Sequence, residues 1–150
     1  MKKIQPILDF LDGKEFAMAG VSRDRKKFGG TVFADLTQKG YTIYPVNPNT
    51  DRIGDHVCYK EIASLPDHVK KLVVITPKNQ TRNVVEQAIR KGIRHIWIQQ
   101  KSDSPEAIKL AEDNHIDLVT GECIYMHSEP VNSVHKFHRS LRKFFGMFPR

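Results

Sequence analysis

Several features that define common protein classes are missing from this 150-residue sequence. No apolar run approaches the roughly 20 residues that a membrane-spanning helix needs. Two lysines stand at the N-terminus, but no apolar signal core follows them, because Asp9 and Asp12 interrupt it. The two cysteines, Cys58 and Cys123, are too few for a disulfide framework or a cysteine zinc cluster. We therefore expect a cytoplasmic protein with reduced thiols and no membrane partner.

Acidic side chains are also in short supply. The chain has 24 Lys and Arg residues against 17 Asp and Glu, a net charge of +7. The surplus sits in two places: residues 23–27 hold four cations and one acid, and residues 135–150 hold five cations and no acid. A basic protein suits a polyanionic partner, which can be nucleic acid, an anionic surface or a small phosphate-bearing ligand.

Apolar strand-like runs alternate with stripes of helical spacing along the chain. Strands are expected over residues 14–22, 71–76, 95–99 and 117–120, and residues 41–49 are expected to form a further strand that runs into a proline-rich turn. Helices are expected over 4–11, from Phe28 to a stop at Gly40, around 84–89 and from Ser104 onward, with a small extended piece at 57–59 and a short helical turn near Ile62. Because parallel strands need such crossovers, the pattern predicts an α/β, Rossmann-like doubly wound, mostly parallel five-stranded sheet over residues 1–130. A basic amphipathic helix is expected over 131–150.

The stretch from Phe16 to Gly30 organises this interpretation. An apolar run ends at Gly20 and Ser22, a cationic loop follows, and two glycines then open a helix. Backbone N–H groups and the positive dipole end of a helix attract anions. The loop residues Arg23, Arg25, Lys26 and Lys27 add positive charge, so we expect a phosphate-bearing ligand here.

The fingerprint of a dinucleotide-binding loop is incomplete. Ser22 stands where its second glycine would be, and the second strand ends in Val46-Asn47-Pro48, with no acid before Asp51 to hold an adenosine ribose. NAD is therefore disfavoured. Four cations beside the loop favour a ligand with more phosphate, and coenzyme A, with a diphosphate and a 3′-phosphate, meets that requirement better than NADP does.

The motifs also support a family resemblance. Gly20-Val21-Ser22, Lys27-Phe28-Gly29, Tyr44-Pro45-Val46-Asn47-Pro48 and Gly121-Glu122-Cys123 occur in the order found in the small CoA-binding protein family. The chain resembles that family over nearly all of residues 10–126, and the family in turn resembles the CoA-binding domain of the succinyl-CoA synthetase α subunit. The resemblance implies a Rossmann-like fold that binds coenzyme A or an acyl-CoA at the strand tips.

The resemblance also implies site residues. Gly20, Val21, Ser22 and Lys27 would line the phosphate and pantetheine side; Val46, Asn47 and Pro48 would touch the adenosine; Thr76 and Pro77 would form the floor; Gln99 and Cys123 would face the thiol end. Apart from the resemblance, the charge and position of the loop also make Arg25, Lys26, Phe28 and Gly29 candidate ligand-binding residues. In the synthetase a separate downstream domain carries a phosphorylated histidine, for which 150 residues leave no room. We therefore expect a non-catalytic sensor, carrier or accessory module, and no residue is assigned a catalytic role.

Other interpretations of the same residues stay open. Cys123 is either a thiol near the ligand or a small buried hydrophobe. His127, His135 and His138 lack a further ligand at convincing metal-site spacing, so no metal is expected. The basic segment after residue 130 could instead bind nucleic acid in a ligand-sensing regulatory protein, although docking of its apolar stripe on the domain or on a second copy is favoured, which leaves a homo-oligomer open. An NADP-dependent oxidoreductase ranks last, because no proton donor is evident.

Overall fold

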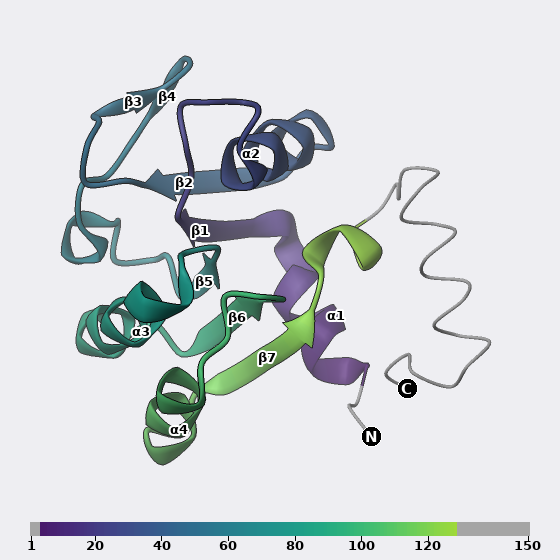
Figure 1. The fold of residues 1–150 in the computed structure, drawn as a ribbon. Helices are drawn as coiled ribbons and strands as arrows, with labels where there is room; N and C mark the ends of the chain where they lie inside the picture. Colours follow the sequence, from purple (N-terminus) through teal and green to yellow (C-terminus); the bar gives the residue numbers. More distant parts are fainter. Residues whose placement is uncertain (1–3, 129–150) are drawn as a thin grey trace.

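The computed structural model describes residues 4–128, and the predicted basic helix over 131–150 lies outside them. The described chain forms a three-layer α/β domain (Figure 1). Its main sheet contains β1 (Glu15–Ala19), β2 (Thr42–Val46), β5 (Lys71–Val74), β6 (His95–Gln99) and β7 (Asp117–Glu122). Its helices are α1 (Gln5–Leu11), α2 (Phe28–Gln38), α3 (Lys78–Lys91) and α4 (Pro105–Asp113), with short 3₁₀ turns η1 (Asp12–Lys14), η2 (Ile62–Ser64) and η3 (Ile124–Met126).

The strand order is β2-β1-β5-β6-β7, and every neighbouring pair is parallel. The chain moves outward from β1 to β2, returns to the other side of β1 with β5, and continues through β6 to β7. The direction of winding thus reverses between β1 and β5, which makes that point the topological switch of the sheet. The α/β, Rossmann-like, doubly wound fold and the five-stranded sheet are both confirmed.

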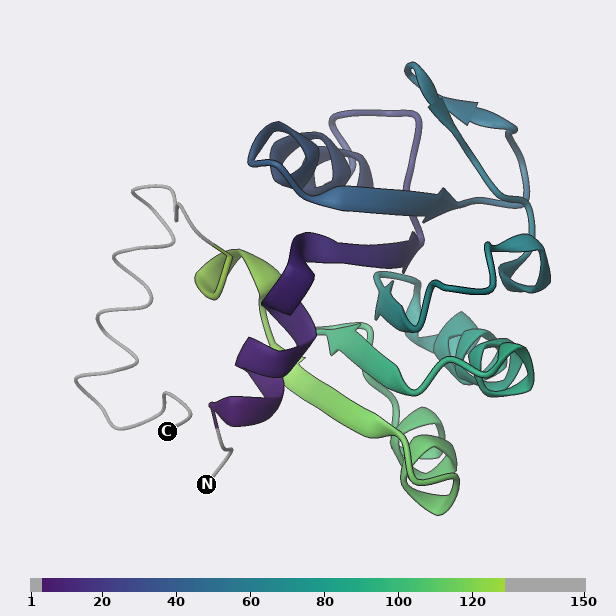
Figure 2. The ribbon, with the colours of Figure 1, turned by 180° about the vertical axis from the view of Figure 1, so that it is seen from behind.

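Alternating side chains of the buried strands serve two separate cores. Phe16 and Met18 of β1 face α1, α2 and η3, whereas Ala17 and Ala19 face α3 and its neighbours. The small residues on the second face let α3 pack close to the sheet. Views from opposite sides show helices on both faces (Figures 1 and 2). Burial on both faces explains why the strands are continuous apolar runs rather than alternating ones.

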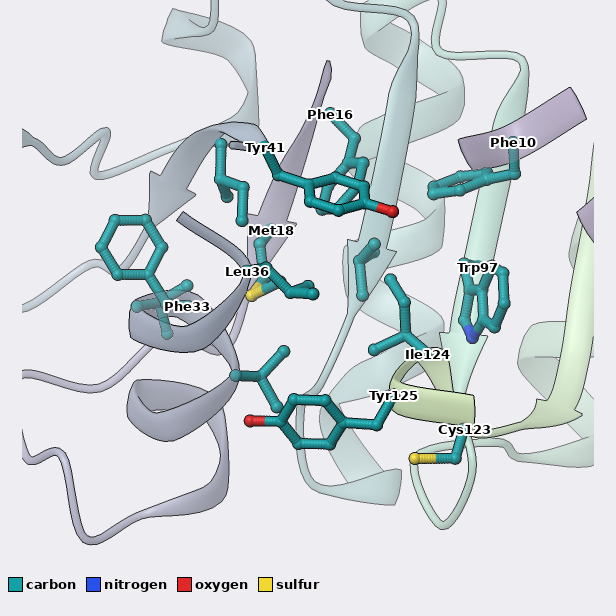
Figure 3. Close-up of a cluster of buried hydrophobic side chains, with 14 of the residues drawn as sticks. Phe10, Phe16, Met18, Phe33, Leu36, Tyr41, Trp97, Cys123, Ile124 and Tyr125 are labelled. Atoms are coloured by element: carbon teal, nitrogen blue, oxygen red, sulfur yellow. The ribbon is translucent and has the colours of Figure 1, made fainter. Parts of the chain in front are cut away.

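Aromatic side chains dominate the core on the α1 and α2 side (Figure 3). The Phe10 ring lies 5.6 Å from Phe16 and 5.5 Å from Trp97, measured between ring centroids. Trp97 is fully buried, and its indole N–H donates to the backbone carbonyl of Glu122. These contacts attach the predicted N-terminal helix to the middle of the sheet.

The edge strand β2 carries Pro45, a residue that cannot donate to a sheet ladder and is therefore suited to an edge. The expected extended piece at 57–59 pairs with this edge: Val46 and Tyr59 form a parallel bridge. It continues a two-stranded antiparallel ribbon, β3 (Arg52–Ile53) with β4 (His56–Val57), which the sequence pattern did not predict.

Element ends differ modestly from expectation. The first strand stops at Ala19 rather than Ser22, because Gly20 adopts a φ of +94° and turns the chain out of the sheet. The last strand runs on to Glu122, two residues beyond the expected end. Within residues 4–128, no helix combines the length and apolar character that crossing a bilayer would require.

Candidate ligand-binding cleft

An open cleft of about 1080 Å³ lies at the carboxyl ends of β1, β2 and β5, at the switch point of the sheet. Three segments supply its inner walls: the loop after β1, the turn after β2 and the start of α3. The η2 region and the outer face of α3 extend it. The lining residues are Ala19–Ser22, Lys27, Val46–Asn49, Lys60–Ala63, Thr76, Pro77, Gln80, Asn83, Val84, Gln87, Arg90 and Lys91.

The loop between β1 and α2 is held by its own short hydrogen bonds. The Asp24 N–H donates to Ser22 Oγ (3.0 Å), and the Lys26 N–H donates to Asp24 Oδ1 (2.9 Å). From the first turn of α2, Thr31 Oγ1 donates to the Arg25 carbonyl (2.6 Å). Ser22 therefore folds the loop and does not cap the helix, whose N-cap residue is Lys27.

Two helices begin at the cleft without a side-chain cap. The N-cap residues are Lys27 for α2 and Pro77 for α3, and neither provides a capping side-chain hydrogen bond. Both residues line the cleft. Because first-turn N–H groups need acceptors and carry the positive end of the helix dipole, this arrangement attracts an anionic group to the space between the two helix ends.

Asn47 ties two walls of the cleft together. Its side-chain Nδ2 donates to the Val21 carbonyl (2.8 Å), and its Oδ1 accepts from the Asn49 N–H (2.8 Å). One amide thus joins the turn after β2 to the loop after β1, 26 residues apart in the chain. The position predicted to touch an adenosine has an evident structural task as well, which is to set the width of the inner cleft.

The floor is fixed by a buried hydroxyl chain. Thr81 Oγ1 donates to the Ser102 carbonyl (2.7 Å) and lies 2.9 Å from Thr76 Oγ1. Since the Thr81 hydroxyl has a single proton, the Thr76 hydroxyl donates to it. The chain connects the end of β5, the first turn of α3 and the segment after β6.

We expect Thr81→Val to lower the free energy of unfolding by about 2 kcal/mol, because it leaves the Ser102 carbonyl and the Thr76 hydroxyl without their buried partner. Urea denaturation of the purified variant measures this loss. Thr81→Ser keeps the hydroxyl and should retain most of the stability. Equal losses for the two variants would show that packing of the methyl group matters instead.

The cations of the cleft fall into two classes. Arg90 bonds to Glu86 at 3.2 Å and Lys91 to Asp67 at 2.9 Å, so these cations already have partners. In contrast, Lys27 and Lys60 are exposed and have no carboxylate within 4.0 Å among residues 4–128. Unpaired lysines on two separate walls suit a ligand that carries more than one anionic group.

The structure brings together many of the predicted site residues. Gly20, Val21, Ser22, Lys27, Val46, Asn47, Pro48, Thr76 and Pro77 all line the cleft. Arg25 and Lys26 lie on the exposed loop beside it, and Phe28 is exposed at the start of α2 with its ring 6.0 Å from that of Tyr125. Gly29 is buried under the loop, where a side chain would meet the Gly20 carbonyl. Their contact with a ligand stays a prediction.

Gln99 and Cys123 do not line the cleft. Gln99 is buried, and its Oε1 accepts from the Ile124 N–H (3.0 Å), so the amide anchors η3. Cys123 is buried beside Ile124 and Tyr125 in the aromatic core (Figure 3). This is the environment of a small hydrophobe, the alternative given for Cys123 above. A role for Gln99 and Cys123 at the thiol end of a ligand stays a prediction.

Sequence reasoning missed the outer half of the cleft. Neither Lys60 nor the polar residues Gln80, Asn83 and Gln87 are among the predicted site residues, although the spacing of the latter three places them on one face of α3. That polar stripe is a signal that the sequence did contain. Lys60 is different, because only its pairing with β2 brings it to the cleft.

No group of three or more His, Cys, Asp or Glu side chains within residues 4–128 is arranged to hold a metal ion. His127 instead pairs with Glu122 at 3.1 Å, with both side chains almost fully buried. The other two histidines considered for a metal, His135 and His138, lie outside the described residues.

The comparison with known proteins bears on this cleft. A family model described as a CoA binding domain matches residues 14–129, which include every cleft-lining residue. The chain is 34% identical over 111 residues to the ADP-forming acetate–CoA ligase II of Archaeoglobus fulgidus, covering 73% of this chain and 16% of the ligase. It is 23% identical over 126 residues to the α subunit of the ADP-forming acetate–CoA ligase II of Pyrococcus furiosus, covering 77% of this chain and 28% of that subunit.

Solved structures of small proteins share the fold along nearly their whole length. A hypothetical protein from Pyrococcus horikoshii superposes with a TM-score of 0.78 at 26% identity, covering 87% of this chain and 92% of that one. A conserved hypothetical protein from Pyrococcus furiosus superposes with a TM-score of 0.71 at 31% identity, covering 73% of this chain and 95% of that one. By contrast, the chain spans less than a third of the two ligase sequences.

Fold and cleft together define a doubly wound α/β domain with an anion-attracting cleft at its switch point. The family match is more specific: the chain belongs to the CoA binding domain family and is homologous to the CoA-binding portion of ADP-forming acetate–CoA ligases.

Proposed function

We propose that this chain binds coenzyme A or an acyl-CoA in the cleft at the switch point, and that it acts as a sensor, carrier or accessory protein without catalysis of its own. The observation that carries the proposal is the convergence of two uncapped helix starts and the unpaired Lys27 inside the region matched by the family. A diphosphate is the natural occupant of such a point.

The residues present fit the ligand in size and in charge. A volume of about 1080 Å³ exceeds what a mononucleotide fills and accommodates an adenosine diphosphate with an attached arm. Lys27 and the first turns of α2 and α3 would hold the diphosphate, and Val46–Asn49 would line the adenosine side. The amide face of α3 offers hydrogen-bonding partners for the peptide-like pantetheine arm. Bound CoA supplies a thiol that carries acyl groups as thioesters.

The chemistry of the lining supports binding rather than turnover. Among the described residues, the cleft lining contains no cysteine and no histidine. Covalent acyl or phosphoryl transfer needs a nucleophile with a positioned base. The Ser22 hydroxyl bonds to a backbone N–H and the Thr76 hydroxyl to that of Thr81, so neither is paired with a base among the hydrogen bonds of residues 4–128. The ligase activity of the longer relatives is therefore not proposed for this domain.

Isothermal titration calorimetry with CoA, acetyl-CoA, NAD and NADP tests the proposal. We expect CoA or acetyl-CoA to bind and the two dinucleotides to bind far more weakly. Tight NAD binding with no CoA binding at millimolar ligand would overturn the proposal, and tight NADP binding would favour the oxidoreductase alternative.

Two adjacent lysines allow a matched comparison. Lys27→Ala should weaken CoA binding by about tenfold, because it removes a charge-assisted contact from the cleft wall, and should reduce the salt dependence of binding. Lys26→Ala removes the same charge one residue away, outside the cleft lining, and should change the affinity by less than about threefold. Titrations of both variants at two salt concentrations measure the difference; equal effects would mean that the loop acts only through its overall charge.

A further inference from the structure

A positive side chain stands at the end of β2, supplied by a different segment of the chain. The turn Val46–Asn49 itself carries no charge. The Asn47 N–H donates to the Tyr59 carbonyl (2.9 Å), and the Tyr59 N–H donates to the Pro45 carbonyl (2.8 Å). This pairing holds Lys60 beside the tip of β2, where it lines the cleft.

In doubly wound domains the end of the second strand is where the ribose of an adenine nucleotide is recognised. A carboxylate there accepts from a free ribose hydroxyl, whereas a cation there accommodates a phosphate esterified to the ribose. This chain has a cation at that position, because Lys60 stands where a carboxylate would bind a free ribose hydroxyl. We infer that Lys60 binds the phosphate on the ribose of coenzyme A, the 3′-phosphate; this rests on the proposed function.

The remaining cations of the cleft are less suited to that role. Lys27 lies at the start of α2, on the wall formed by the loop after β1, where the diphosphate is expected. Lys91 bonds to the Ala63 carbonyl and to Asp67, and Arg90 bonds to Glu86. The carboxylate of Glu61 adjoins Lys60 in sequence and lines the cleft, yet it lies more than 4.0 Å from the Lys60 ammonium. Lys60 is therefore free to bind an anion.

The experiment compares CoA with 3′-dephospho-CoA, two ligands that differ only in this phosphate. Both are titrated by calorimetry into the wild-type protein, Lys60→Ala, Lys27→Ala and the charge control Lys70→Ala, which changes a lysine just before β5 that does not line the cleft. The wild type should bind CoA about tenfold more tightly than dephospho-CoA, the usual effect of one charge-assisted contact. Lys60→Ala should lose that preference by weakening CoA binding alone.

The controls separate the two proposals. Lys27→Ala should lower the affinity for both ligands by a similar factor, and Lys70→Ala should leave both affinities within about twofold of wild type. If the wild type binds both ligands equally, or if Lys60→Ala weakens both equally, the assignment of Lys60 is wrong while CoA binding stands. If neither ligand binds the wild type, the proposed function itself fails.

Discussion

Gly20→Ala should lower the free energy of unfolding by about 4 kcal/mol and abolish measurable CoA binding. Gly20 has a φ of +94°, a conformation that costs an alanine roughly 1 kcal/mol. The larger part is steric. A Cβ at this position would overlap the Ile75 carbonyl oxygen and lie 2.6 Å from its carbon, both backbone atoms at the end of β5. Forced overpacking of this kind costs about 3 kcal/mol.

A second glycine separates these two contributions. Gly40 also has a φ of +94°, but a Cβ built on it would meet nothing within 4 Å. Gly40→Ala should therefore lose only the conformational part, about 1 kcal/mol. Urea denaturation monitored by Trp97 fluorescence gives both values. Losses of the same size would mean that the loop and the end of β5 move apart freely, which would remove the steric argument for a rigid cleft.

The close approach at Gly20 has a consequence for the site. Because this backbone lies directly against the residue before Thr76, the two walls of the inner cleft are in contact at their base. Asn47 holds the third wall through the Val21 carbonyl. The shape of the inner cleft is thus held by backbone contacts and one side-chain amide.

The fold and the residues of the inner cleft could be predicted from the sequence alone. Short apolar runs rich in β-branched residues, such as Leu72–Val74, favour strands buried on both faces, and the helical stripes between them favour parallel crossovers. Carboxyl ends of parallel strands then share one edge, so Gly20–Ser22, Val46–Pro48 and Thr76 could be grouped without coordinates. That argument works because it depends only on local pattern and on strand direction.

The rest of the site depends on pairings that no local pattern reveals. Lys60 enters the cleft through the bridge between Val46 and Tyr59, which joins segments outside any regular crossover. Gln99 and Cys123 do follow or end strands, as predicted, but the chain after β7 turns into η3. Gln99 is then used to bind the Ile124 N–H. Position at a strand tip thus places a residue near the correct edge without determining which face it joins.

The glycine pair at the start of α2 belongs to the stretch predicted to bind phosphate, and the structure gives it a packing role as well. Gly29 and Gly30 are the second and third residues of the helix and are both buried. A Cβ on Gly30 would overlap the Asp24 carbonyl oxygen and lie 2.8 Å from the Ser22 carbonyl oxygen. The helix therefore begins in direct contact with the backbone of the cationic loop.

This contact reverses the usual sign of a helix substitution. Replacing a helical glycine by alanine ordinarily stabilises a protein by up to about 1 kcal/mol through helix propensity. Gly30→Ala should instead destabilise it by about 2 kcal/mol, because the overlap with two carbonyl oxygens costs roughly 3 kcal/mol and outweighs the propensity gain. Denaturant unfolding measures the net change, and Gln38→Ala at the exposed end of the same helix provides a control expected to be near neutral.

The same variant links packing to binding. If α2 must retreat from the loop to accommodate the new methyl group, its first-turn N–H groups move away from the cleft, and CoA affinity should fall by at least about tenfold even where the protein stays folded. Near-native circular dichroism with lost affinity would support this coupling. A Gly30→Ala protein that is more stable than wild type and binds CoA normally would contradict the prediction. It would show that the loop moves aside without loss of stability, so that the close contact is not why glycine is needed here.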